Sequence, residues 1–190
     1  MRYFIPIGAD CSPARILKTK GLRVFSFPFD WIVCPIYTIY KLLSNNFKGF
    51  MENIIILDKD NRILFNENDE NMELIVSNTK IYPVIDIQYD ILFPHDFYNN
   101  DKNTIINIKN KYKRRIDRLM QILNNINNEV IFVYSDLVLN EWQKSKFNQC
   151  NIYIENKYMN CHNETILDNI SSMFTNCKII HIDNIENYNL

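Results

Sequence analysis

Cys11 stands where a predicted strand gives way to a predicted helix. Residues 3–7 are apolar and end at Gly8, and Ser12-Pro13 supplies a helix N-cap followed by a proline suited to the first turn. The unpaired amides and positive pole of a helix N-terminus stabilise a thiolate and lower the pKa of a thiol. The same amides can hold an oxyanion. Cys11 is therefore a candidate nucleophile; the alternative is a buried structural cysteine.

His95 is the candidate general base. The chain has three histidines, and this one lies beside Asp96 among aromatic residues, before the longest predicted helix. A Cys–His pair comes from distant positions in a chain, so a separation of 84 residues from Cys11 is compatible with catalysis. Asp96 is a candidate to orient the imidazole. The alternative is a hydrogen-bonded histidine near the core.

Asp30 is the second candidate carboxylate. It lies within Phe27-Pro28-Phe29-Asp30-Trp31, and a carboxylate in such surroundings must be hydrogen-bonded or shift its pKa. Two roles are open. Asp30 either orients His95 as the third member of a triad or caps the helix that follows.

Several stretches resemble, in order, an uncharacterised family described as "putative papain-like cysteine peptidases", which occurs in bacteria and large DNA viruses. The resemblance covers about residues 4–135. It implies that Cys11 is the nucleophile and His95 the base. The matching stretches are Ile7-Gly8-Ala9-Asp10-Cys11-Ser12-Pro13-Ala14, Gly21-Leu22-Arg23, Ser26-Phe27-Pro28-Phe29-Asp30-Trp31-Ile32, Phe93-Pro94-His95-Asp96-Phe97, Lys111-Tyr112-Lys113-Arg114-Arg115-Ile116-Asp117-Arg118 and Val130-Ile131-Phe132-Val133.

The same stretches supply three candidate substrate-binding residues, which are Asp10, Trp31 and Arg115. The family's blocks often continue into an arginine after the strand at residues 130–133, whereas this chain has Tyr134-Ser135-Asp136. If that arginine binds substrate, the resemblance implies altered specificity or an inactive member.

The strands and helices that must position these residues predict an α/β fold. We expect one domain over residues 1–190. Strands at 130–134, 152–155 and 178–182 alternate with helices at 137–147 and 164–174, the pattern of a mostly parallel sheet flanked by helices in three layers. We expect the strand at residues 3–7 to join this sheet. The alternative is a papain-like α+β fold, with a cysteine-bearing helix against an antiparallel barrel.

The middle of the chain is less regular. Residues 54–57 and 62–65 flank a polar turn and predict a hairpin, followed by strands at 74–76 and 81–87. An apolar stripe with steps of three and four residues predicts a helix over residues 105–126. Six basic side chains lie off this stripe and predict a solvated face; they are Lys109, Lys111, Lys113, Arg114, Arg115 and Arg118.

The composition of the chain excludes some classes of protein. The chain of 190 residues is 47% hydrophobic, and its 21 basic and 22 acidic side chains give a net charge of −1. These values exclude a disordered chain and predict no nucleic-acid or membrane partner. An abundance of Asn and Ile indicates an AT-rich genome, viral or bacterial.

The cysteines and the N-terminus predict a cytoplasmic protein. The five cysteines are widely spaced with no CxxC, which favours free thiols and no metal site, and the first residues are not those of a signal peptide. No phosphate-binding glycine motif occurs, so we expect no cofactor.

The leading functional prediction is a cysteine-dependent hydrolase or an acyl or amide transferase acting through a thioester on Cys11, with a peptide, amide or acyl substrate. The alternative is a non-catalytic module that holds an anionic ligand or a protein partner at the Cys11 turn and the basic helix.

Overall fold

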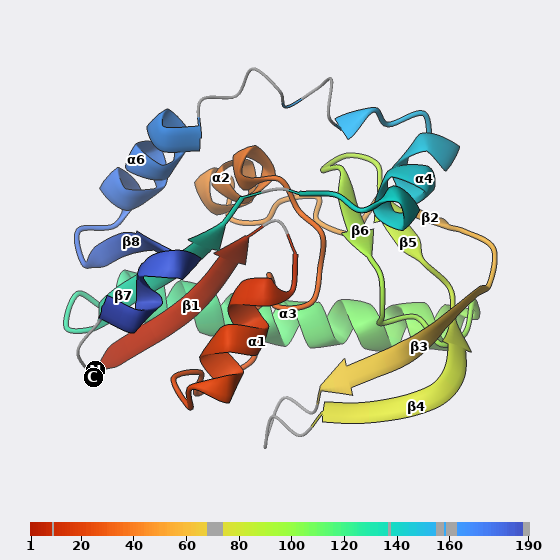
Figure 1. The fold of residues 1–190 in the computed structure, drawn as a ribbon, viewed down its shortest axis with the longest axis horizontal. Coiled ribbons are helices and arrows are strands. Elements are labelled where there is room, and N and C mark those ends of the chain that lie inside the picture. The colour runs from red at the N-terminus through yellow and green to blue at the C-terminus, as the bar shows by residue number, and fades with distance from the viewer. Residues whose placement is uncertain (9, 68–73, 137, 155–157, 159–162, 188–190) are drawn as a thin grey trace.

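A three-stranded parallel sheet forms one part of the molecule, at the left in Figure 1. The computed structural model describes residues 1–8, 10–67, 74–136, 138–154, 158 and 163–187. The sheet has the order β1-β7-β8, formed by β1 (Arg2–Gly8), β7 (Glu129–Ser135) and β8 (Cys177–His181). Arg2 of β1 pairs with Glu129, and Gly8 with Ser135, so both strands end at one edge of the sheet.

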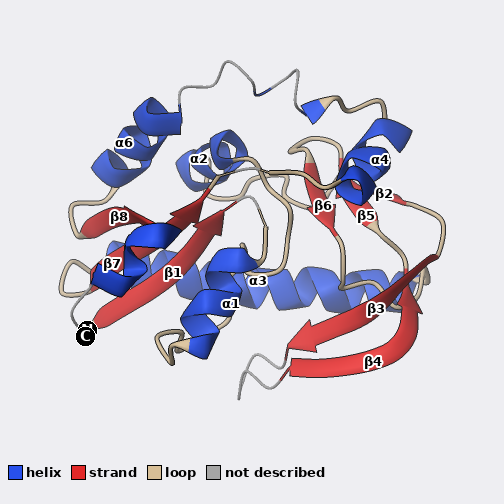
Figure 2. Ribbon diagram, in the orientation of Figure 1, coloured by secondary structure: helices blue, strands red, loops and turns tan. Residues whose placement is uncertain are grey.

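Helices cover both faces of this sheet, as Figure 2 shows. On one face lie α2 (Ile36–Ser44), α3 (Lys102–Asn124) and α6 (Asn163–Met173). On the other lie α1 (Ser12–Thr19) and a short 3-10 helix, η1 (Ile182–Asn187). Because both faces are covered, β7 is buried along almost its whole length, which explains its unbroken apolar sequence. The predicted α/β class with a parallel sheet between helices is confirmed.

Two antiparallel elements lie beside this layered body. The first is a small sheet of order β2-β5-β6, formed by β2 (Ile54–Ile56), β5 (Val84–Asp86) and β6 (Ile91–Phe93). The second is a hairpin of β3 (Asp60–Glu67) and β4 (Leu74–Ile81). The predicted hairpin between residues 54–57 and 62–65 is wrong, because β2 pairs with β5 and β3 pairs with β4. The predicted strand at 81–87 is interrupted before β5 by Pro83, which has no N–H to donate.

The predicted strand at residues 152–155 is also wrong. Ile152 and Tyr153 belong to no strand, and Glu155 lies outside the described residues. The Ile152 amide donates to Phe147 O, and Ile154 packs with Phe147 in the cluster between α4 (Glu141–Gln149) and the small sheet. Ile154 is thus buried against a helix while Tyr153 is exposed, and β8 lies directly beside β7.

Side-chain caps set the starts of two helices. Asp101 accepts a hydrogen bond from the Thr104 amide and starts α3. Asn140 and Gln143 form a capping box that starts α4 at Glu141, four residues later than the sequence predicts. Within the described residues, no helix is long and apolar enough to cross a membrane.

Candidate active site

The Cys11 junction, Gly8 together with residues 10–15, lies at the edge where β1 and β7 end. Cys11 is half-buried at the N-cap of α1, and its carbonyl accepts a hydrogen bond of 3.0 Å from the Arg15 amide. Open α/β sheets place their ligands at this carboxyl edge. The local sequence signals thus put the thiol where the strand-to-helix prediction expects it.

Asp10 occupies part of the helix N-terminus. Its carboxylate accepts hydrogen bonds from the Ser12 amide at 2.8 Å and the Ser12 hydroxyl at 3.2 Å. Pro13 has no N–H, so two of the first three positions of α1 have no free amide for an oxyanion.

The pKa of Cys11 moves in the direction opposite to our prediction. Burial raises it above the ordinary value of 9.0, and the adjacent Asp10 raises it further, while Arg15 and the Cys11 amide oppose the change. The helix N-terminus by itself therefore leaves a neutral thiol near pH 7. A nucleophilic Cys11 needs a base.

His95 follows β6 and is almost fully buried, with 9% of its surface exposed. Its neighbour Asp96 accepts hydrogen bonds from the Lys111 ammonium and from the Tyr112 hydroxyl, the latter at 2.7 Å. Burial alone would raise the pKa of Asp96, but Lys111, Arg115 and the Tyr112 hydroxyl lower it. Asp96 is thus a carboxylate held by α3, and the pairing of His95 with Cys11 stays a prediction.

Asp30 is fully buried and pairs with the guanidinium of Arg23. The same carboxylate accepts a hydrogen bond of 2.7 Å from the Phe27 amide, which closes the turn at residues 27–30. Burial raises the pKa of Asp30, and the charges of Arg23 and Arg115 oppose that rise. The described contacts of Asp30 are therefore a local turn and an ion pair; its orienting role stays a prediction.

Glu67, at the end of β3, is the most heavily coordinated carboxylate of the described residues. It accepts hydrogen bonds from both terminal nitrogens of Arg23 at 2.6 and 2.5 Å. It also accepts hydrogen bonds from the Ser26 hydroxyl at 2.8 Å and from the Trp31 indole N–H at 3.1 Å. Lys18 of α1 lies 3.3 Å away. Burial raises the pKa of Glu67, but the Arg23 contacts and the other donors outweigh it and lower that pKa to about 2.

These side chains form one cluster, which we call the buried charge network. Arg115 connects its two halves, because its charge acts on both Asp30 and Asp96. Three cations face three carboxylates, and each of the six is less than 10% exposed. The network comprises Arg23, Asp30, Glu67, Asp96, Lys111 and Arg115.

The predicted solvated face of the basic helix is partly wrong. Lys111 and Arg115 are buried in the network: Lys111 pairs with Asp96, and both cations lie over the Tyr112 ring. Lys113 and Arg114 are exposed as predicted.

Two of the candidate substrate-binding residues are likewise enclosed. Trp31 is 6% exposed and bonded to Glu67, and Arg115 is fully buried. Their contact with a substrate stays a prediction, as does that of Asp10.

Sequence reasoning missed Glu67 and Arg15. Glu67 lies in the acidic, Asn-rich stretch of residues 66–73, which predicts a loop, and nothing local marks it as a partner of Arg23. The position of Arg15 could have been predicted from the sequence. Residues four apart share a helix face, so its side chain lies next to Cys11.

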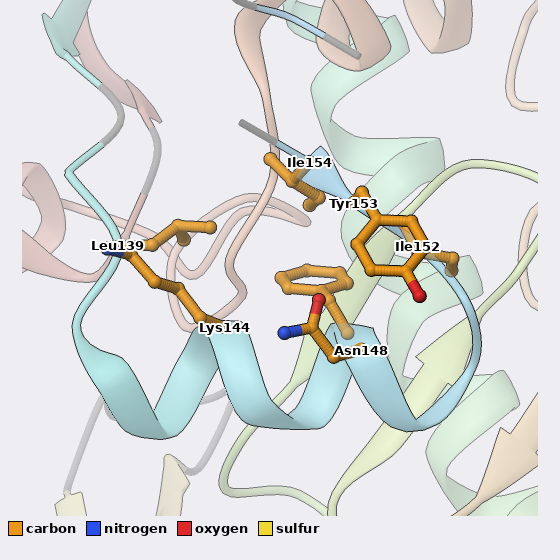
Figure 3. Close-up of a pocket in the computed structure, with 7 residues that line it drawn as sticks. Leu139, Lys144, Asn148, Ile152, Tyr153 and Ile154 are labelled. Carbon is orange, nitrogen blue, oxygen red and sulfur yellow. The ribbon is translucent and has the colours of Figure 1, made fainter. Parts of the chain in front are cut away.

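A small pocket lies beside α4 (Figure 3). Leu139, Ile154 and Tyr153 surround it, and its volume is about 120 Å³. None of the predicted site residues lines it. Within the described residues, no group of three or more His, Cys, Asp or Glu side chains is placed to hold a metal ion.

Comparison with known proteins gives one family. A family model described as "putative papain-like cysteine peptidase (DUF1796)" matches residues 2–164. An uncharacterised protein of Acanthamoeba polyphaga mimivirus is 32% identical over 127 residues, which cover 60% of this chain and 53% of that protein. The aligned part thus spans about half the length of this relative. No solved structure matches the chain.

Proposed function

Because this chain belongs to the family described as putative papain-like cysteine peptidase, we propose that it is a cysteine-dependent hydrolase or acyl transferase whose nucleophile is Cys11. The proposed substrate is a peptide, an amide or another acyl donor. A nucleic acid is not the proposed substrate, because the net charge of −1 gives no general attraction to phosphates.

One observation carries this proposal. Cys11 is the half-buried thiol at the carboxyl edge of the parallel sheet, at the start of a helix, with the exposed Arg15 one turn away. The other described cysteines lack this setting. Cys34 and Cys177 are buried, and the pKa of Cys150 is raised by burial alone.

In the proposed reaction His95 takes the proton from the Cys11 thiol as sulfur attacks the substrate carbonyl. The resulting tetrahedral intermediate collapses to a thioester, and the leaving amine or alcohol takes the proton from His95. Water or an acceptor amine then gives a proton to His95 and displaces the Cys11 thiolate. The thiolate regains its proton from His95, so protons balance over the cycle.

A base is essential because the pKa of Cys11 is raised. We propose Asp96, adjacent to His95, or Asp30 as the carboxylate that favours the imidazolium. Support comes from Asp96, which is adjacent to His95 in the chain and is held by hydrogen bonds from Lys111 and Tyr112.

Alkylation of individual cysteines tests the proposal. The native protein is treated with iodoacetamide at pH 7, and the labelling rate of each cysteine is read from its peptide by mass spectrometry. Cys150 is the matched control, since it too is half-buried. Thiolate fraction sets the alkylation rate, and transfer of the Cys11 proton to His95 would raise that fraction, so we expect Cys11 to react at least about tenfold faster than Cys150.

The variant His95→Gln should bring the Cys11 rate down to that of Cys150, whereas His181→Gln should leave it unchanged. Equal rates for the two thiols in the wild-type protein contradict the enzyme proposal. They favour the rival class, a non-catalytic module for an anionic ligand or protein partner.

A further inference from the structure

A second pocket lies between α3 and the segment that follows α2. Its volume is about 610 Å³, within the range of roughly 300–1,000 Å³ that is usual for small-molecule sites. Phe47, Phe50 and Tyr112 supply aromatic surface to it. It shares no lining residue with the Cys11 junction.

The wall of this pocket has an unusual backbone. Asn46, Phe47 and Met51 have φ angles of 54°, 59° and 60°, and Gly49 has 81°. This left-handed region is rare for residues other than glycine and is strained for bulky ones. Such strain persists only where the surroundings impose it, and it concentrates at ligand sites.

Buried polar groups impose this conformation. The Asp86 carboxylate accepts the Met51 amide at 2.7 Å, and the Tyr89 hydroxyl donates to Lys48 O and accepts from Asn45 Nδ2 at 2.8 Å. Asp86 is fully buried and Tyr89 is 3% exposed. Asp86 and Tyr89 thus hold the strained segment from the protein interior, and the opposite side of that segment faces the pocket.

The rim of the pocket is cationic. Lys48, Lys109 and Lys113 line it, against one carboxylate, that of Glu52. Lys113 is held by Asp117 at 2.8 Å. Within the described part of the chain, no carboxylate pairs with Lys48 or Lys109. Two lysines are therefore available to an anion above an aromatic floor.

We propose that this pocket binds a small organic anion, with its apolar or aromatic body against Phe50 and its phosphate or carboxylate group between Lys48 and Lys109. The aromatic floor favours a ligand with a ring or acyl body over a bare inorganic ion. The proposal does not rest on the chemistry at Cys11, although Tyr112 of this pocket donates a hydrogen bond to Asp96.

Titration calorimetry at low salt tests the site with four probes. Phenyl phosphate and benzoate carry both parts of the ligand and distinguish phosphate from carboxylate. Inorganic phosphate carries the charge alone, and benzyl alcohol the ring alone. We expect phenyl phosphate or benzoate to bind at least about tenfold more tightly than either single-feature probe.

The variants Lys48→Gln and Lys109→Gln should each weaken that binding by about fivefold or more. Lys102→Gln, which removes the same charge from the exposed first turn of α3 outside the pocket, is the matched control and should leave affinity unchanged. Equal loss in all three variants, or no preference for the two-part probes, overturns the proposal. Unchanged melting temperatures of the variants show that lost binding is not lost folding.

Discussion

Stretches that resemble the same family build the Cys11 junction and all of the buried charge network except Glu67, yet the polar groups of the two regions have opposite settings. At the junction, Cys11 is half-buried and Arg15 is exposed, so both can meet a solute. In the network, Arg23 and Asp30 have no exposed side-chain surface and bond to each other. Charged residues in a recognisable motif can therefore serve the interior of a fold, and the two regions should respond differently to substitution.

The largest effect should follow removal of a cation from the network. Arg23→Ala leaves Asp30 and Glu67 buried without their main partner, and breaking a buried ion pair in this way costs about 3–5 kcal/mol. The free energy of unfolding in urea measures this loss. Arg2→Ala is the control, because its pair with Glu129 is exposed and worth about 0–1 kcal/mol. Similar losses in the two variants would erase the contrast between buried and exposed pairs.

Acid should destabilise the network next. The pKa of Glu67 is about 2 in the folded protein, below the ordinary 4.5, so its contribution is complete above about pH 4.5 and is lost as pH falls toward 2. The loss from Glu67 should be on the order of 3 kcal/mol; the lowered pKa of Asp96 acts in the same direction, and the raised pKa of Asp30 acts in the opposite one. Unfolding free energies across this window measure it. Glu67→Gln should flatten the slope, and an unchanged slope would refute this assignment.

A smaller effect should follow crowding of the junction. A Cβ on Gly8 would lie 2.6 Å from Ser135 Oγ and 2.9 Å from Pro13 Cγ, so Gly8→Ala should cost about 1–3 kcal/mol. Thermal unfolding measures this cost. Ser135→Ala removes the closer contact, and adding it to Gly8→Ala should restore part of the stability. No recovery in the double variant would mean that the strain lies elsewhere.

The smallest effect on stability should come from the thiol itself. Cys11→Ser loses little volume and keeps a polar group at the turn, so it should change the unfolding free energy by less than about 1 kcal/mol. It should also abolish labelling by an electrophilic probe. A strongly destabilised variant whose protein still labels like the wild type would make Cys11 a core residue.

Local signals predicted the parts of the fold that depend on neighbouring residues. The junction followed from an apolar run, Gly8 and Ser12-Pro13, and α3 followed from the spacing of its apolar residues. Strand partners were harder, because β2 pairs with β5 across a segment that contains the whole β3–β4 hairpin. Apolar runs such as residues 152–154 fit a strand or a helix-packed segment equally well.

The candidate site divides in the same way. The position of Cys11 could be predicted from the sequence, but the direction of its pKa change could not, because that direction depends on burial and on the Asp10 charge. The buried charge network could not be predicted from the sequence. Arg23 and Glu67 are 44 residues apart, and the apolar stripe of α3 does not show that Lys111 and Arg115 are buried.

The register of the parallel sheet also has a consequence for biosynthesis. Arg2 and Glu129 pair across 127 residues of chain, so β1 leaves the ribosome long before its only hydrogen-bonded neighbour in the described sheet. Synthesis proceeds at about 5–20 residues per second, so β7 is made roughly 6–25 seconds after the apolar Ile5 and Ile7 of β1. During that interval the first strand is an exposed, unpaired edge, the kind of segment that chaperones bind and that aggregates when they are scarce.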